Sequence, residues 1–310
     1  MGEIELSSMD ERLLRFMMLN GAHHSVYSMG EKLRISPQTV AYKIRKFEEE
    51  GIISSYHYRV NPYKVGFRNM TWCALDISRH GYPEGLEERL LSHPNIFAVY
   101  SLAGQVDLLA KVFYSEQGEL KELIEWLGVN FRDIISKVSI VSVMKVEKLY
   151  NTHGFDVVPG QLDDTSLAIL DYKLAHTESS LKATADALDL HRNTVSRRWN
   201  QLWSKGVLLK KSFYVLPEVY KSLGFGVSAC VFVDTVPGHH DSFVKNALNN
   251  DKVHEVFSLA FRHDLLLMLR TNDIDDCYGT MKSFYSSDRI EDTETLVILS
   301  HCEKNILPIH

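Results

Sequence analysis

Residues Ile35 to Ile53 read ISPQTVAYKIRKFEEEGII: a Ser-Pro pair, basic residues at helical spacing, three glutamates and a glycine. Ser36 is placed to cap a helix that begins at Pro37, because a serine side chain accepts from first-turn amides and proline has no amide that needs a partner. Gly51 is placed to end the helix. The stretch therefore predicts a capped helix of about three to four turns.

The two faces of this helix differ in chemistry. Val40, Ile44 and Phe47 share one face and are expected to pack inward. The opposite face is polar and basic, which suits a polyanion better than a protein core. Its members are the first set of candidate DNA-binding residues: Gln38, Thr39, Tyr42, Lys43, Arg45 and Lys46.

The chain contains the same pattern twice. LHRNTVSRRWNQLWSKGVL, from Leu190 to Leu208, matches the first stretch. Other matches follow in the same order: YKVGF (63–67) with KSLGF (221–225), and YSLAGQVDLLAKV (100–112) with FSLAFRHDLLLML (257–269). The offset stays between about 155 and 158 residues. A constant offset over many matches predicts a tandem duplication.

The second basic helix has different residues on its outer face. Val195, Trp199 and Leu202 are expected to pack inward. Arginine and asparagine suit bidentate recognition of guanine and adenine, so the two helices should prefer different half-sites. The second set of candidate DNA-binding residues is Arg192, Asn193, Thr194, Arg197, Arg198 and Gln201.

Periodicity divides each half into a helical and a mixed part. In the first half, helical patterns from Met9 to Leu19 and from Ser25 to Leu33 precede the capped helix, and a strand or wing follows it. Three short helices with a tight turn before the third make a helix-turn-helix, whose third helix enters the major groove of double-stranded DNA. The expected domains are 1–61 (helical), 62–150 (mixed), 151–161 (linker), 162–216 (helical) and 217–310 (mixed).

The mixed parts follow a strand–helix–strand–strand–helix–strand order, which is the ferredoxin-like βαββαβ unit. The runs HDLLLMLR (263–270) and VSIVSVM (138–144) are apolar at both strand parities, so both sheet faces need cover. Two helices cover one face, and a second copy of the sheet would cover the other, within one chain or between chains. The expected fold is α+β: a winged helix-turn-helix plus a βαββαβ domain, repeated twice.

Composition and motifs exclude several classes of protein. The 310 residues carry a formal net charge of −6 and contain no apolar run long enough to span a membrane. The four cysteines form no C-x-x-C pair and the start shows no secretory signal, which favours a cytoplasmic address. Histidines are expected at the surface, with no metal-ligand spacing. We find no nucleophile or phosphate-loop motif, and therefore expect no enzyme, no catalytic residue and no cofactor.

The order of these motifs resembles the Lrp/AsnC family, the feast/famine transcription regulators. The resemblance is carried by Leu162-Asp163 before the first helix, by SPQTV (36–40) and HRNTV (191–195) opening the third, and by glycines. These glycines are Gly51 and Gly206 after the third helix and Gly66 and Gly224 before the sheet. The resemblance covers nearly the whole chain as two consecutive units, and implies a transcription regulator.

The resemblance also implies an effector and an assembly. In this family the βαββαβ domain mediates dimerisation and often binds an amino acid near a Gly-x-x-Asp turn. The first copy has this turn, and Gly104 and Asp107 are its candidate effector residues. The second copy reads Phe261-Arg262-His263-Asp264 and has no glycine there. We expect an amino acid or another small effector, and a homo-oligomer formed through the βαββαβ domains.

Two alternatives use the same architecture. Sirohaem decarboxylases also combine helix-turn-helix and βαββαβ units, and would need histidines and basic residues around a tetrapyrrole. His254 and the pair Arg262-His263 are the residues that could serve there. The basic outer faces of both third helices would then have no purpose. The other alternative is an oligomeric co-regulator that does not bind DNA.

Overall fold

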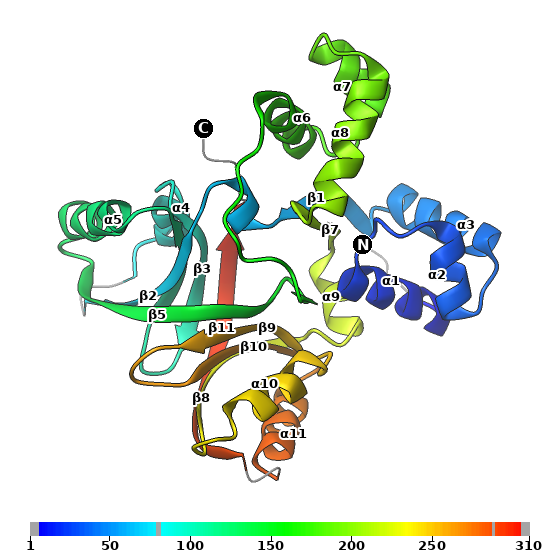
Figure 1. Cartoon of the computed structure of the whole chain (residues 1–310). Coiled ribbons are helices and arrows are strands. Elements are labelled where there is room, and N and C mark those ends of the chain that lie inside the picture. The colour runs from blue at the N-terminus through cyan, green and yellow to red at the C-terminus, as the bar shows by residue number, and fades with distance from the viewer. Residues whose placement is uncertain (1–5, 79–81, 287–288, 305–310) are drawn as a thin grey trace.

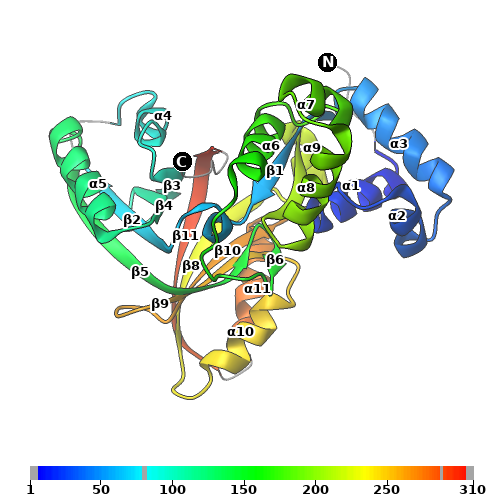
Figure 2. The same cartoon turned by 45° about the horizontal axis from the view of Figure 1, so that its top comes forward.

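The computed structural model describes residues 6–78, 82–286 and 289–304. It consists of two three-helix headpieces beside a large closed sheet (Figure 1). A second view shows the headpieces next to each other, outside the sheet (Figure 2). The expected α+β fold of repeated winged helix-turn-helix and ferredoxin-like units is confirmed. No helix in the described part of the chain has the length and apolar character needed to cross a membrane.

The first headpiece forms as its capping residues predict. Ser7, Ser25 and Ser36 each accept a hydrogen bond from a first-turn amide, so each helix begins at its own cap. Val40 and Phe47 are buried, and Ile44 packs partly against the same core. The helices are α1 (Ser8–Asn20), α2 (Val26–Leu33) and α3 (Pro37–Glu49).

The second headpiece repeats this arrangement with other capping residues. Asp163, Ser180 and the ring of His191 accept the first-turn amides. Val195, Trp199 and Leu202 are buried, as expected. The helices are α6 (Asp164–Ala175), α7 (Leu181–Ala187) and α8 (Arg192–Ser204).

A two-stranded ribbon joins the headpieces. The wing strands β1 (Ile53–Val60) and β7 (Leu208–Val215) pair antiparallel. Tyr58 on β1 packs into the core that contains α6 and α8, whereas Phe213 on β7 packs into the core that contains α1 and α3. Each strand therefore contributes to the core of the other headpiece, which fixes the position of one headpiece relative to the other.

The two βαββαβ units close into one ring of strands. Adjacent strands follow the order β2-β4-β3-β11-β8-β10-β9-β5, and β5 pairs back with β2. The pairings β3–β11 and β5–β9 join the units, so the expected pairing of mixed domains occurs within one chain. The strands are β2 (Asn69–Ile77), β3 (Ile96–Ala103), β4 (Leu108–Tyr114), β5 (Ile135–Leu149), β8 (Val227–Thr235), β9 (Val253–Leu259), β10 (Leu265–Thr271) and β11 (Ile290–Glu303).

Alternate residues of these strands face two different cores. Leu266 and Met268 point into the ring, whereas Leu265, Leu267 and Leu269 face the helices outside it. This double burial explains why HDLLLMLR is apolar at both parities. The outer helices are α4 (Leu86–Leu91) and α5 (Gln117–Asn130) on one unit and α10 (His240–Leu248) and α11 (Ile274–Tyr285) on the other (Figure 1).

Strand β5 departs from this pattern. Val141 and Val143 pack toward the inner core, and Val138 packs toward α5. Ile140 and Met144, however, are 38% and 74% exposed. The outer helices reach only the first part of this long strand, so the expectation that VSIVSVM is covered on both faces is wrong for its outer face.

Short elements complete the connections between domains. The 3-10 helix η1 (Pro62–Val65) follows β1, and α9 (Pro217–Ser222) follows β7. The expected linker contains β6 (Thr152–His153), which pairs with β5. It also packs on η1, because the Lys64 ammonium binds the Asp156 carboxylate at 2.5 Å and the Gly160 amide donates to the Tyr63 carbonyl at 2.8 Å.

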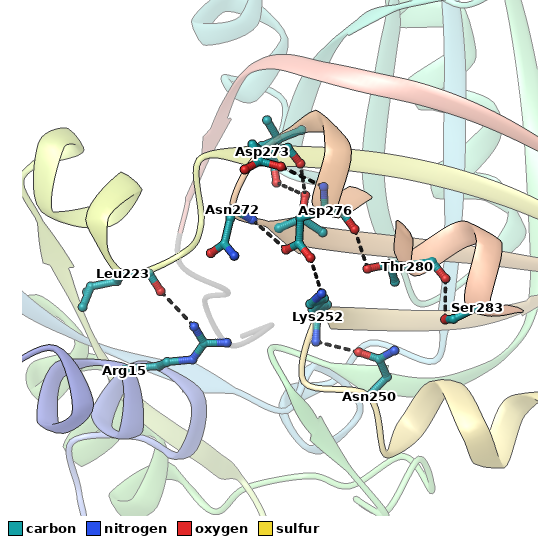
Figure 3. Close-up of polar contacts among 11 residues, drawn as sticks. Arg15, Leu223, Asn250, Lys252, Asn272, Asp273, Asp276, Thr280 and Ser283 are labelled. Atoms are coloured by element: carbon teal, nitrogen blue, oxygen red, sulfur yellow. Dashed lines mark hydrogen bonds and ion pairs between the residues drawn. The ribbon is translucent and has the colours of Figure 1, made fainter. Parts of the chain in front are cut away.

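The first headpiece docks on the second βαββαβ unit (Figure 3). Arg15 on α1 donates to the carbonyl of Leu223 at 3.2 Å, and its guanidinium lies 5.5 Å from the centre of the Phe225 ring. Behind this contact, Asp276 accepts hydrogen bonds from Lys252 and from the Asn272 amide. The contacts of Arg15 hold α1 against the segment between α9 and β8.

Candidate nucleic-acid interface and a basic cavity

The polar face of α3 is largely open to solvent. Gln38, Tyr42, Arg45 and Lys46 are exposed, and Tyr42 is 58% exposed despite its aromatic ring. Thr39 is half-buried, and its hydroxyl lies 2.8 Å from the Ser36 hydroxyl at the cap. Lys46 forms an exposed ion pair with Glu50 at 3.6 Å, and the exposed members of this face are accessible to a partner.

The corresponding face of α8 is similar in outline. Arg192, Asn193 and Arg197 are exposed, and Thr194 and Gln201 are half-buried. In helix-turn-helix proteins, residues at the beginning of the third helix contact base edges, and arginine and asparagine suit such contacts. The two faces thus share their position in the fold and the threonine at Thr39 and Thr194, but not their other residues.

Lys43 and Arg198 are exceptions within these faces. Lys43 binds the Asp10 carboxylate at 2.5 Å, and Arg198 binds the Asp163 carboxylate at 2.9 Å. Burial alone would raise the pKa of Asp10, but hydrogen bonds from Lys43 and Ser7 outweigh it and hold this pKa below its ordinary value. Both were predicted to contact DNA, and in the structure each ties its third helix to the beginning of the first.

The glycine and the aspartate of the Gly-x-x-Asp turn both have structural roles. The Asp107 carboxylate accepts from the Ile77 amide at 2.7 Å, and a side chain at Gly104, where φ is +156°, would lie 2.2 Å from Leu296. In the second copy Asp264 accepts from the Thr235 amide at 2.7 Å, while Phe261 takes φ 80° and is 96% exposed. Both turns are held by the same carboxylate-to-amide bond, with or without the glycine.

A cavity lies where the first headpiece meets the second βαββαβ unit. It has a volume of about 480 Å³. The ribbon forms one wall through residues of β1 and β7, and strands β9, β10 and β11 form another. The end of α1 and helix α9 close the remaining sides. Its charged, histidine and tyrosine residues are His57, Arg59, Tyr150, Lys210, Tyr214, Tyr220, Lys221, Asp251, His254, Arg270, His301 and Glu303.

Positive charge predominates in this cavity. Arg59 binds Glu303, and its guanidinium lies 4.6 Å from the centre of the Tyr150 ring. The Lys210 ammonium donates to backbone carbonyls at the end of α1, including that of Leu19 at 3.0 Å. Arg270 lies 5.7 Å from the centre of the Tyr220 ring and forms no ion pair among the described residues. Burial, followed by the charges of Arg59 and Arg270, lowers the pKa of Lys210 to about 7.

The histidines of the cavity are held neutral. His57 is 4% exposed, and neither ring nitrogen has a hydrogen-bond partner among the described residues. Burial and the charge of Arg59 lower the pKa of His57 to about 3. Burial also lowers the pKa of His254 and of His301, with Arg270 as the next cause for both. The expectation of surface histidines is wrong for His57.

Sequence reasoning missed this cavity because its residues are scattered. One local signal was available: His57 and Arg59 alternate on a strand and so share a face. Lys210 pairs with Arg59 across the ribbon, whereas His254 and Arg270 come from two strands of the second βαββαβ unit. Only the fold brings these residues around one cavity. Of the residues considered for a tetrapyrrole, His254 lines the cavity, whereas Arg262 and His263 line a separate pocket of about 220 Å³.

Comparison with known proteins shows sequence similarity to transcriptional regulators and structural similarity to solved proteins. No protein-family model matches the chain. An HTH-type transcriptional regulator of Pyrococcus abyssi is 30% identical over 153 residues, which are 48% of this chain and 99% of that protein. The HTH-type transcriptional regulator Ptr1 of Methanocaldococcus jannaschii is 32% identical over 103 residues, 33% of this chain and 68% of that protein.

Among solved structures, one protein is similar over nearly the whole chain and another over about half of it. The siroheme decarboxylase NirDL, solved in complex with an iron-uroporphyrin III analogue, has a TM-score of 0.63 at 13% identity and covers 97% of this chain and 94% of its own. AsnC of E. coli has a TM-score of 0.40 at 18% identity over 45% of this chain and 93% of its own. At 13% identity the likeness to NirDL shows the fold alone.

The sequence relatives define the family. A regulator of single-unit length is matched almost end to end by about half of this chain, at 30% identity. The chain carries that unit twice, with the same order of elements in each half. It therefore belongs to the Lrp/AsnC family of helix-turn-helix transcription regulators, as a chain of two family units in tandem.

Proposed function

We propose that this protein is a sequence-specific, DNA-binding transcription regulator in which α3 and α8 each enter a groove of double-stranded DNA. The proposal is carried by one observation: two third helices, held by a common ribbon, both present exposed polar and basic residues. Arg45, Lys46 and Arg197 would displace counterions from phosphates. Gln38, Arg192 and Asn193 stand at the helix beginnings, where base contacts are made.

The two helices would read different half-sites. An ordinary dimer of identical units reads a palindrome, because its symmetry repeats the same contacts. Here the α3 face carries Gln38 and Tyr42 where the α8 face carries Asn193 and Arg197. The operator should therefore be asymmetric, with half-sites about 34 Å apart or a multiple of that distance.

Footprinting on genomic fragments, followed by binding titrations at several salt concentrations, tests this function. Arg45→Ala with Arg197→Ala should weaken binding and reduce the salt slope by about 0.9 for each phosphate that the variant no longer neutralises. Arg132→Ala, an exposed arginine on the far βαββαβ unit, is the matched control and should leave the slope unchanged. A protein that gives no footprint would favour the DNA-silent co-regulator. A slope that the double variant shares with the control would show that Arg45 and Arg197 do not contact phosphates.

The effector and the assembly remain predictions. The family resemblance places an amino acid at Gly104 and Asp107, but the Asp107 carboxylate already accepts an amide and Leu296 packs against the glycine. Calorimetry with each of the common amino acids, on wild type and Asp107→Asn, addresses this site directly. Association of copies would need surfaces other than the strand edges of the ring, which pair within the chain.

A second candidate function has support of its own. The whole-chain likeness to NirDL and the cavity with His57, His254 and Arg270 together favour binding, and decarboxylation, of a carboxylate-bearing tetrapyrrole. A visible spectrum of the purified protein, before and after addition of iron-uroporphyrin III, tests it. An intense band near the Soret region that shifts on binding supports this candidate, and an unchanged ligand spectrum rejects it.

A further inference from the structure

The duplication supplies an internal reference for the basic cavity. His254 on β9 and Arg270 on β10 correspond, at an offset of 157 residues, to Phe97 on β3 and Phe113 on β4. In the first unit these phenylalanines pack with Phe67 at ring-centre distances of 5.2 to 6.0 Å, and all three are buried. The same position in the fold is thus a solid aromatic core in one unit and a polar cavity in the other.

Replacing buried phenylalanines by histidine and arginine lowers the free energy of unfolding unless new contacts of the polar groups compensate the loss. Apolar packing is removed, and polar groups must be taken out of water. The described residues do not supply full compensation: His57 has two ring nitrogens without a partner, and Arg270 has no carboxylate within ion-pair distance. Buried polar groups in folded proteins almost always have partners. Arg270 lines the cavity, and its guanidinium is the group that a bound carboxylate would pair with.

The missing partner should be an anion with an apolar body. Arg59, Lys210 and Arg270 line the cavity, and Glu303, the carboxylate among them, is already bound to Arg59. An ammonium group would have no free carboxylate except that of exposed Asp251. The rings of Phe213, Tyr214, Tyr220 and Phe225 supply apolar walls, and a volume of about 480 Å³ is in the range of small-molecule sites.

We infer that this cavity binds a small organic anion with a carboxylate and an aromatic body, and that Arg270 binds the carboxylate. Such a ligand would give Arg270 the carboxylate that no described residue supplies. Guanidinium-to-carboxylate hydrogen bonds are among the stronger polar contacts in proteins. A carboxylated tetrapyrrole shares this chemistry, so the two sources of the carboxylate are separated by experiment.

The ligand would also regulate the headpieces, a step that rests on the proposed DNA-binding function. His57 and Arg59 belong to β1, which joins α3 to its βαββαβ unit, and Lys210 holds the last carbonyls of α1. An occupant therefore touches the ribbon and the docked end of the first headpiece at once. It would bias the position of the ribbon that spaces α3 and α8, and with it the affinity for a two-site operator.

Binding is tested without DNA, by thermal shift and calorimetry with matched probes. Phenylacetate and indole-3-acetate provide the carboxylate and the ring, phenylacetamide removes only the charge, and phenethylammonium reverses it. We expect the two carboxylates to raise the melting temperature and the amide and the cation to leave it unchanged. Equal shifts for phenylacetate and phenylacetamide, or no shift with either carboxylate, would overturn the inference.

Variants locate the site. Arg270→Gln should weaken carboxylate binding by about tenfold or more, because the guanidinium charge that binds the carboxylate is removed. His254→Phe with Arg270→Phe recreates the aromatic residues of the first unit, and should fold with a raised melting temperature and bind no carboxylate. Arg132→Gln is the control for charge removal outside the cavity. Carboxylate binding that survives in the double phenylalanine variant places the site elsewhere.

Two further experiments separate the small-anion site from the tetrapyrrole site and ligand binding from regulation of DNA binding. Iron-uroporphyrin III is titrated in the same way; if it alone binds, and Arg270→Gln abolishes that binding, the cavity belongs to the second candidate function and not to a small effector. Operator affinity is then measured with and without the carboxylate. Unchanged affinity in a protein that binds both partners refutes the regulatory step alone, whereas carboxylate binding without any DNA binding refutes the proposed function and leaves the site intact.

Discussion

At the scale of single residues, each headpiece has an ion pair that joins its third helix to its first, and we call this ion pair the brace. Lys43 and Arg198 occupy equivalent positions on α3 and α8, and each binds a carboxylate at the beginning of the first helix. That carboxylate is the third residue of α1 in one case, Asp10, and the capping residue of α6 in the other, Asp163. The brace therefore holds the orientation of each third helix within its headpiece.

The brace predicts a contrast between two neighbouring cations of α3. Lys43→Ala should lower the free energy of unfolding by about 1 kcal/mol, because it leaves the largely shielded Asp10 carboxylate without its charged partner. Its effect on the salt slope of DNA binding should be small. Arg45→Ala should do the opposite: no loss of stability and a slope reduced by about 0.9. Urea denaturation and salt titration of both variants check this; identical behaviour would contradict the assignment of their roles.

His57 predicts a dependence of stability on acid. Its pKa is lowered to about 3 by burial first and by the charge of Arg59 next, whereas the unfolded chain titrates near its ordinary value of about 6.5. Between these values the unfolded state binds more protons, so the free energy of unfolding falls as the pH drops from about 6.5 toward 3.

His57→Phe should reduce this acid sensitivity, with the remainder due to His254 and His301, whose pKa values are also lowered. Urea denaturation of both proteins at pH 7, 5.5 and 4.5 measures the effect. If the variant loses stability with the same slope as the wild type, His57 is not a source of the acid response.

At the scale of elements, the ribbon of β1 and β7 determines how the headpieces sit. Tyr58 on β1 packs edge-on against Trp199 and Trp203 of α8, at ring-centre distances of 5.1 and 6.1 Å. Its hydroxyl donates to the carbonyl of Thr177 at 3.4 Å. The wing of the first unit is thus a structural part of the second headpiece, and neither third helix can move without straining the other headpiece.

Tyr58→Ala should separate headpiece coupling from groove contact. Removing a buried aromatic side chain should cost about 3–5 kcal/mol of stability. Affinity for a complete operator should fall more than affinity for a DNA carrying a single half-site, because only the former needs both helices at a fixed separation. Tyr27→Ala, at a tyrosine that is 72% exposed on α2, is the control. An equal loss on both DNAs would argue against the ribbon as the spacer.

At the scale of the whole molecule, an ion pair inside the ring distinguishes the two units. Lys111 on β4 and Glu255 on β9 form hydrogen bonds of 2.7 and 2.9 Å and are almost completely buried. Their counterparts at the same offset are Met268 and Ala98. A ring built from two first units would bury two lysines without a carboxylate here, and one built from two second units would bury two glutamates. The pair therefore favours closure of the ring by one unit of each kind.

Exchanging these residues for their counterparts tests this selectivity. Lys111→Met should lower the free energy of unfolding by about 3–5 kcal/mol, because Glu255 stays buried without its partner. Lys111→Met with Glu255→Ala should recover most of this loss. The double variant should also form chain-exchanged dimers, detected by light scattering after refolding at high concentration. A strictly monomeric double variant would show that the covalent link alone sets the pairing.

Much of this architecture could be predicted from local patterns. Ser36 and Pro37 marked the beginning of α3, and the apolar residues at both parities of β10 predicted a strand buried on both faces. Exact partners were not predictable. Asp10 lies 33 residues from Lys43, and nothing in the periodicity of α3 distinguishes a braced cation from a free one. The candidate DNA-binding residues could be placed on a face, but not assigned individual roles.

The sequence by itself determined the two tandem units, their helical and mixed parts and the family, because caps, periods and repeats are properties of neighbouring residues. Only the tertiary structure decided that the units close one ring within the chain, that Lys43 and Arg198 are tied down, and that His57, Lys210 and Arg270 surround one cavity. The physical reason is distance along the chain: periodicity shows which side of an element is buried or polar, and only packing determines what lies opposite.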